Sequence, residues 1–177
     1  MTGLPGYRVE LFAEQNRVDK ADVIKLWIRD AALDPNEAER RAAEILAVAT
    51  DGQGDLAAVS TTYLQHNDQL RCELWHTRVF VAAAHRQSGL AIELAHTARD
   101  HLTERFVSGA DRRSIGVLFE IESPILKRFF PDAIWARTRF VFIGENARGD
   151  HVRVFYFPGA LAPEPDGGPP PAGWGRT

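Results

Sequence analysis

The sequence predicts an α/β (α+β) domain with a mixed, mostly antiparallel sheet of about seven strands and about four flanking helices. Short segments in which apolar and polar residues alternate have the pattern of half-buried strands. Three of these segments follow one another with only turns between them, which is typical of an antiparallel meander. A long segment with apolar residues at helical spacing then interrupts the strands, and further strand segments follow it.

The strand predictions depend on alternation and on turn residues between the segments. "DGQGD" and "QHNDQ" are the turns of the meander, and "ENARGD" joins a closing hairpin. The predicted strands are 7–15, 45–50, 56–64, 70–82, 113–122, 137–144 and 151–157.

The helix predictions depend on start signals and on apolar residues three and four positions apart. Asp19 is a predicted N-cap. Asp34 is another, followed by Pro35 at the first helical position, and Ser123 with Pro124 repeats this pattern. The predicted helices are 18–33, 33–45, 88–106 and 123–130. The element order is therefore β-α-α-β-β-β-α-β-α-β-β.

Composition limits the classes of function. The chain has 177 residues, 45% of them hydrophobic, and a formal net charge of -3, so a basic field for nucleic acid is absent. No apolar run approaches a membrane span, and no secretory signal is recognisable, so we expect a cytoplasmic protein without a membrane partner. Cys72 stands alone, and the histidines have no ligand spacing, so no metal site is predicted. Only three of the 21 basic residues are Lys, which indicates a GC-rich bacterial genome.

The chain divides into two parts by composition. Residues 1–158 contain all the predicted elements and form one domain. Residues 159–177 are rich in Pro and Gly and have few apolar anchors, so we expect a flexible tail.

One corner of the sequence has the chemistry of an anion site. In "VFVAAAHRQSGLA", residues 79–91, an apolar strand ends and a long helix begins immediately after Gly89. The first N–H groups of a helix lack partners and carry the positive end of its dipole, which suits a phosphate. Gly89 lets the backbone approach closely, Ala91 keeps the next turn narrow, and Arg86 adds a permanent charge.

This corner and the element order resemble the GNAT superfamily of acyl-CoA N-acyltransferases. The family signature is Arg or Gln, two variable residues, Gly, one variable residue, then Gly or Ala; Arg86–Ala91 matches it at the strand-to-helix junction where the family has it. The resemblance covers about residues 7–157 and implies a splayed central strand pair with acetyl-CoA as acyl donor. The diphosphate would bind the backbone at the corner, and the pantetheine arm would pair with the preceding strand. The implied cofactor-binding residues are Val79, Val81, Arg86, Gln87, Ser88, Gly89, Leu90 and Ala91.

The resemblance also implies a base on the strand before the corner. Glu73 and His76 lie there and point to opposite faces, so only one of them can face the cleft. Either can instead be structural, Glu73 as a solvated surface carboxylate and His76 as a hydrogen-bonded sheet residue. Glu122 and Ser123, at the end of the next strand, are further catalytic candidates, with helix capping as the alternative. The Tyr with which many family members protonate the thiolate is replaced by Phe, so Ser123 or water would supply that proton.

The resulting hypothesis is an acetyltransferase that acts by direct attack of a primary amine in a ternary complex. The predicted acceptor is a cationic small molecule, because the chain is acidic and carboxylates border the cleft. Two alternatives stay open: an acceptor on a macromolecule, either a protein amine or an aminoacyl-tRNA, and a non-catalytic acyl-CoA-binding protein. The final hairpin offers an exposed edge through which a homodimer can form.

Overall fold

The computed structural model describes residues 4–163. The predicted tail, residues 159–177, lies mostly outside this range.

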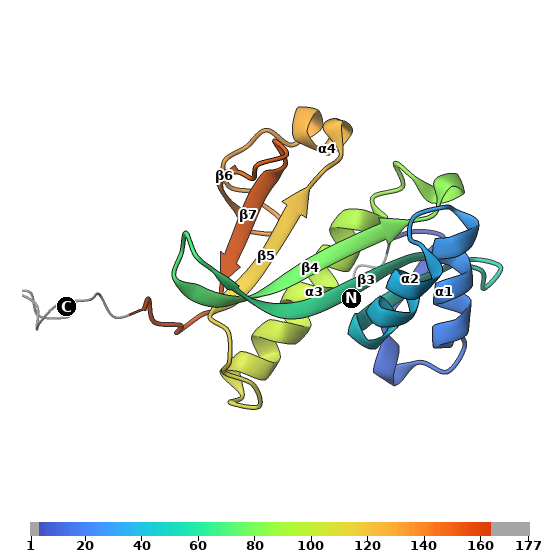
Figure 1. Ribbon diagram of the computed structural model, residues 1–177, viewed down its shortest axis with the longest axis horizontal. Helices are drawn as coiled ribbons and strands as arrows, with labels where there is room; N and C mark the ends of the chain where they lie inside the picture. The colour runs from blue at the N-terminus through green and yellow to red at the C-terminus, as the bar shows by residue number, and fades with distance from the viewer. Residues whose placement is uncertain (1–3, 164–177) are drawn as a thin grey trace, which may run out of the picture.

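Within this range the strands form one seven-stranded sheet in the order β1-β2-β3-β4-β5-β7-β6 (Figure 1). Only β4 and β5 run parallel, so the predicted mixed, mostly antiparallel α/β fold is confirmed. The strands are β1 (Tyr7–Leu11), β2 (Ile45–Asp51), β3 (Leu56–Asn67), β4 (Cys72–Val81), β5 (Gly116–Ile121), β6 (Val141–Glu145) and β7 (His151–Tyr156).

The helices begin where the capping residues predict. Asp19 and Asp22 form a capping box at the start of the first helix, the Asp34 side chain accepts two backbone N–H groups, and Ser123 caps the last helix. The helices are α1 (Lys20–Arg29), α2 (Pro35–Arg41), α3 (Leu90–Val107) and α4 (Pro124–Phe129), with single 3-10 turns η1 (Phe12–Glu14), η2 (Ala42–Glu44) and η3 (Ala83–His85).

Several predicted boundaries were wrong because local turns end the regular structure. The predicted strand 7–15 stops at Leu11, where η1 begins, and the predicted helix 18–33 ends at Arg29. The predicted strand 137–144 begins only at Val141, because Arg139 adopts a left-handed conformation with a φ of 59°.

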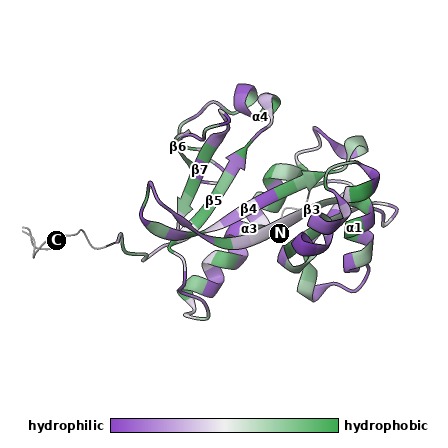
Figure 2. Ribbon diagram, viewed as in Figure 1, coloured by the Kyte–Doolittle hydropathy of each residue, from purple (hydrophilic) through white to green (hydrophobic). Residues whose placement is uncertain are grey.

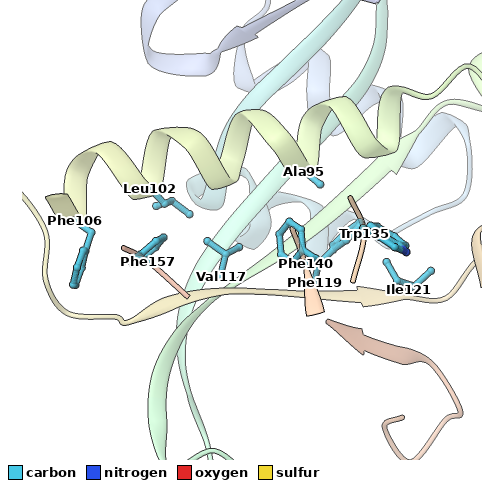
Figure 3. Packing of buried hydrophobic residues seen from close by; sticks show 9 residues of the cluster. All are labelled: Ala95, Leu102, Phe106, Val117, Phe119, Ile121, Trp135, Phe140 and Phe157. Atoms are coloured by element: carbon cyan, nitrogen blue, oxygen red, sulfur yellow. The ribbon is translucent and has the colours of Figure 1, made fainter. Parts of the chain in front are cut away.

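Alternation along the sheet divides the core between its two faces. On one face, α3 packs Leu90 and Leu94 against alanines of β2 and β3. Farther along the same helix, Leu102 and Phe106 join an aromatic cluster over β5, which also contains Trp135 and Phe140 (Figure 3). On the other face, α1 and α2 cover β2 and β3 through a second cluster. Of the helices within residues 4–163, none has the length and apolarity needed to cross a bilayer.

The sheet opens in its middle. β4 and β5 pair only from Trp75–Val117 to Thr77–Phe119, and beyond this point the two strands diverge (Figure 1). β4 stays paired with β3 as far as Val81, and β5 stays paired with β7 as far as Ile121. Near its C-terminal end, where it borders the opening, the otherwise hydrophobic β5 becomes hydrophilic (Figure 2). The divergence thus creates a V-shaped gap with an intact ladder on each side.

β6 forms one edge of the sheet and exposes apolar side chains. Val141 and Phe142 are 36% and 37% exposed, and the neighbouring Ile134 is 58% exposed. The expected homodimer would use this edge, and it stays a prediction.

Gly116 provides a stability test of the β5–β7 ladder. A Cβ atom at this position would lie 2.4 Å from the carbonyl oxygen of Phe155, a backbone atom that cannot move without breaking the ladder. We therefore expect Gly116→Ala to lower the free energy of unfolding by roughly 1–3 kcal/mol. In Gly52→Ala, the matched control, the nearest atom is 3.9 Å away, and the change should stay within about 0.5 kcal/mol. Urea denaturation measures both values, and equal effects would contradict the prediction.

Candidate active site

A cavity of about 1440 Å³ occupies the gap between the diverging strands. Its walls are the C-terminal half of β4, the segment 85–92, the end of β5, and α4. They also include residues of β3 and of the α1–α2 region: Trp27, Ala32, Leu33, Arg41, Val59, Thr61 and Tyr63. All eight predicted cofactor-binding residues line it, and so do three predicted catalytic residues, His76, Glu122 and Ser123. Glu73, the fourth, does not line it.

The turn before α3 presents backbone N–H groups to this cavity. Gln87 and Gly89 both have positive φ values, 68° and 91°, which turn the chain sharply into the helix. The Leu90 N–H donates to Oγ of Ser88 at 3.3 Å, whereas no acceptor within residues 4–163 takes the N–H of Gly89 or Ala91. The 18-residue helix α3 begins at this turn, so the positive end of its dipole lies here. The arrangement is suited to a phosphate or diphosphate.

Arg86 adds a cation at the mouth of the turn. Its side chain is exposed and lines the cavity. It forms no ion pair with any carboxylate of the described residues, so its guanidinium keeps its donors for an incoming anion.

The β4 backbone beyond Thr77 also faces the cavity. The Glu73 carbonyl accepts the N–H of Ile115, so the backbone groups of odd-numbered β4 residues point toward β5. Val79 and Val81 share this direction but lie beyond the last β4–β5 pair. Their backbone groups are therefore available for an extended ligand that would pair like an added strand.

His76 lies where the β4–β5 pairing ends, and its side chain is on the face of the sheet opposite α3. Its ring contacts the Tyr63 ring with 5.3 Å between centroids. Nε2 is buried and has no hydrogen-bond partner within the described part of the chain, so the ring can exchange a proton only through Nδ1. Burial lowers the pKa of His76 below 6.5; the nearby Glu120 opposes this shift and Arg78 adds to it. The imidazole is therefore neutral at pH 7 and able to accept a proton.

Glu73 lies outside the cavity, on the other side of the β4–β5 pairing from Val79. Its carboxylate is 2.9 Å from Nδ1 of His66, at the opposite end of β4. Six residues of strand, roughly 20 Å, separate it from Val79. The structure thus brings His76 to the cavity and leaves Glu73 at the surface, 42% exposed.

The end of β5 adds two carboxylates that share one arginine. Arg148 Nη2 lies 3.3 Å from Glu120 and 3.7 Å from Glu122. Ser123 caps α4 by accepting the Leu126 N–H at 3.4 Å, and its hydroxyl proton stays available. Glu120 and Glu122 therefore do not form a bare anionic surface.

The sequence analysis did not identify several polar lining residues, among them Arg41, Tyr63, Arg78 and Arg148. Arg78 could have been found, because it shares the strand parity of His76. Tyr63 and Arg148 could not. Tyr63 reaches the cavity because β3 pairs with β4, and Arg148, in the turn between β6 and β7, reaches it because β7 pairs with β5.

Known proteins are similar to this chain in structure but not in sequence. No protein-family model matches it, and no curated protein matches it in sequence. A ribosomal-protein-S5-alanine acetyltransferase from Vibrio fischeri superposes with a TM-score of 0.57 at 12% identity, covering 90% of this chain and 97% of that one. A GNAT-family acetyltransferase from Streptococcus pneumoniae gives 0.54 at 11% identity, with 86% and 99% covered. A mutant AtaT toxin, in complex with the C-terminus of the antitoxin AtaR and acetyl-CoA, gives 0.53 at 10% identity, with 85% and 93% covered.

These similarities establish the class of fold. The chain has the fold of the GNAT superfamily, as the Arg86–Ala91 corner and the element order predicted.

The partly buried imidazole of His76 predicts a pH dependence of stability. Because burial holds the folded pKa below 6.5, the unfolded chain binds a proton first as the pH falls, so folded stability is lost below about pH 6.5. His76→Gln should lose less stability between pH 7.5 and 5.5 than the wild type does, as measured by urea denaturation. Leu118→Val, a non-titrating change at the paired position on β5, should retain the wild-type pH dependence. A wild-type slope in His76→Gln would mean that the folded ring ionises freely.

Proposed function

We propose that this protein transfers an acetyl group from acetyl-CoA to a primary amine of a small molecule. The amine attacks directly in a ternary complex of protein, donor and acceptor. The observation that carries the proposal is the combination in one cavity of a phosphate-binding helix turn and an unpaired strand backbone.

The donor would bind along the α3 side of the cavity. Its diphosphate would accept hydrogen bonds from the backbone N–H groups of Gln87–Ala91 and from Arg86. Its pantetheine arm would pair with the backbone of Val79 and Val81. An N–H near Val81 would also stabilise the negative charge that develops on the thioester oxygen during attack.

The acceptor would enter from the opposite face, where His76 lies. Most alkyl amines are protonated at pH 7, so the amine must lose a proton before it can attack. That first proton would leave to solvent as the amine enters the cavity. Nδ1 of His76 would accept the second proton, which is released as the nitrogen bonds to the thioester carbon. The carbon–sulfur bond then breaks and releases the thiolate of coenzyme A.

The thiolate would take its proton from Ser123 or from water. No Tyr lies on α4, where Phe129 stands instead, so the usual donor of the family is missing. Ser123 lines the cavity and keeps its hydroxyl proton, and a thiol pKa near 8.5 makes the thiolate a tolerable leaving group. The proton on His76 then passes to solvent or to Ser123, so that both side chains return to their starting protonation states.

The missing Tyr also favours a second candidate function, an acyl-CoA-binding protein without turnover. Donor binding with no release of free thiol, across a broad panel of amines and macromolecular acceptors, would identify that case.

Acetyl-CoA binding tests the donor site. Gly89→Glu adds a negative charge and a side chain at a left-handed position of the turn, so we expect no heat of binding in calorimetric titration. Gly159→Glu is the matched control, because Gly159 also has a positive φ, 79°, with no atom within 4 Å of its virtual Cβ. Gly159 lies two residues after Phe157, whose ring packs on Phe106 at the C-terminal end of α3, away from the turn at Gly89. Wild-type affinity in Gly89→Glu, or no binding by the wild type, would contradict the proposal.

The role of His76 predicts a loss of turnover. His76→Gln should lower kcat by about 10²–10⁴-fold, as measured by thiol release, because general base catalysis contributes that much. The wild-type activity should fall with decreasing pH below 6.5, as the imidazole becomes protonated. His96→Gln is the control. His96 is another partly buried histidine whose pKa is lowered by burial, but it does not line the cavity, so this variant should keep the wild-type kcat. A comparable loss in Glu73→Gln instead would transfer the role to that carboxylate.

A further inference from the structure

The acceptor face of the cavity carries opposite charges on its two sides. Arg78 and His76 lie on β4 and Glu120 lies on β5, all on the face opposite α3. The β4–β5 register pairs His76 with Leu118. If this pairing continued for two more residues along each strand, Arg78 would lie opposite Glu120. The strands diverge before that point; both side chains line the cavity, and among the described residues no ion pair joins them.

Each of the two side chains is held away from the other by different partners. Arg78 Nη1 donates to Glu44 at 3.0 Å, and the guanidinium lies 3.9 Å from the centre of the Tyr63 ring. Glu120 pairs with Arg148 on the far side of the gap. The positions of the two charges are thus fixed before any acceptor binds.

The ion pairs around Arg78 leave an excess positive charge. Arg40 bridges Glu37 and Glu44, Arg41 pairs with Glu37, and Arg78 pairs with Glu44. Three guanidinium groups are therefore balanced by only two carboxylates. Arg78 and Arg41 line the cavity, and each has five N–H donors, of which the carboxylates take only part.

The ion pairs around Glu120 leave an excess negative charge. Arg148 and Lys127 are linked by ion pairs to Glu120, Glu122 and Asp150. Two cations are thus balanced by three carboxylates on the β5 side of the gap. His76, whose ring is neutral, lies between the two networks.

We infer that the acceptor is an amino-carboxylic acid, a primary amine that also carries a carboxylate. The carboxylate binds Arg78, with Arg41 beside it, and the amine lies between His76 and Glu120. This inference rests on the proposed acetyl transfer and names its substrate class. It replaces the purely cationic acceptor expected from the sequence, because a dication would bring a positive charge to Arg78.

An acceptor panel tests the inference. It contains α-, β- and γ-amino acids and dipeptides, each beside its carboxamide and its decarboxylated amine, and thiol release from acetyl-CoA is measured. We expect kcat/KM to be at least about tenfold higher for the acids than for their matched carboxamides and amines, because a charge-assisted contact is lost in the latter. The preferred distance between the amine and the carboxylate shows whether the acceptor is a free amino acid or a dipeptide.

Variants at the arginines isolate the contact. Arg78→Gln should raise KM for the acids about 10- to 100-fold, leave kcat nearly unchanged, and have little effect on the carboxamides. Arg8→Gln is the matched control: it removes an ion-paired arginine that is 55% exposed, pairs with Glu10 outside both networks, and does not line the cavity. It should behave as the wild type. Arg78→Glu should shift the preference from amino acids to diamines.

The outcomes distinguish this inference from the proposed function. Calorimetric titration with acetyl-CoA should give equal affinities for the wild type and Arg78→Gln. If acetyl-CoA binds but diamines or carboxamides react as well as the acids, the acceptor class is wrong and the donor site stands. The same conclusion follows if no acid in the panel reacts, or if Arg78→Gln slows all acceptors equally. If acetyl-CoA does not bind to the wild type, the proposed function fails, and the inference fails with it.

Discussion

The site depends on an interrupted hydrogen-bond ladder. β4 and β5 pair over only three residues each and then separate, while each keeps its other neighbour. A buried backbone polar group without a partner is costly, so a strand edge inside a protein needs something to pair with. Here the edge opens into a cavity, where a ligand with amide groups can complete the ladder. On the α3 face, the aromatic cluster that contains Trp135 and Phe140 fills the space between β5 and α3 (Figure 3).

β4 contributes to both the donor side and the acceptor side of this cavity, because the directions of its backbone groups and side chains alternate along the strand. The backbone of odd-numbered β4 residues points along the sheet toward β5, while their side chains pack on α3. The side chains of His76 and Arg78 point to the opposite face. The donor can therefore bind through main-chain groups of Val79 and Val81 without using side chains. The side chains of the same strand remain free to act on the acceptor.

A buried arginine supports the remaining wall of the cavity. Arg153 on β7 is 1% exposed, and its Nη2 donates to the carbonyl of Phe130 at 3.3 Å. Nε1 of Trp135 donates to the same carbonyl at 2.9 Å, and the Arg153 guanidinium stacks 4.3 Å from the centre of the Trp135 ring. These contacts hold the end of α4 in place. Phe129, which is 68% exposed and lines the cavity, is positioned from there.

The sequence by itself determined the features that depend on local chemistry. Helix starts at Asp19, Asp34 and Ser123 were predictable because a cap bonds its own first turn. The turn at Gly89 was predictable because an apolar strand ends and a long helical pattern begins on either side of this Gly, which lets the backbone approach closely. Tertiary structure alone decided that β4 and β5 diverge after Thr77, and that His76 rather than Glu73 reaches the cavity. Strand parity gives the face of a side chain, but the residue across the gap depends on pairing between segments about 40 positions apart, which no local pattern encodes.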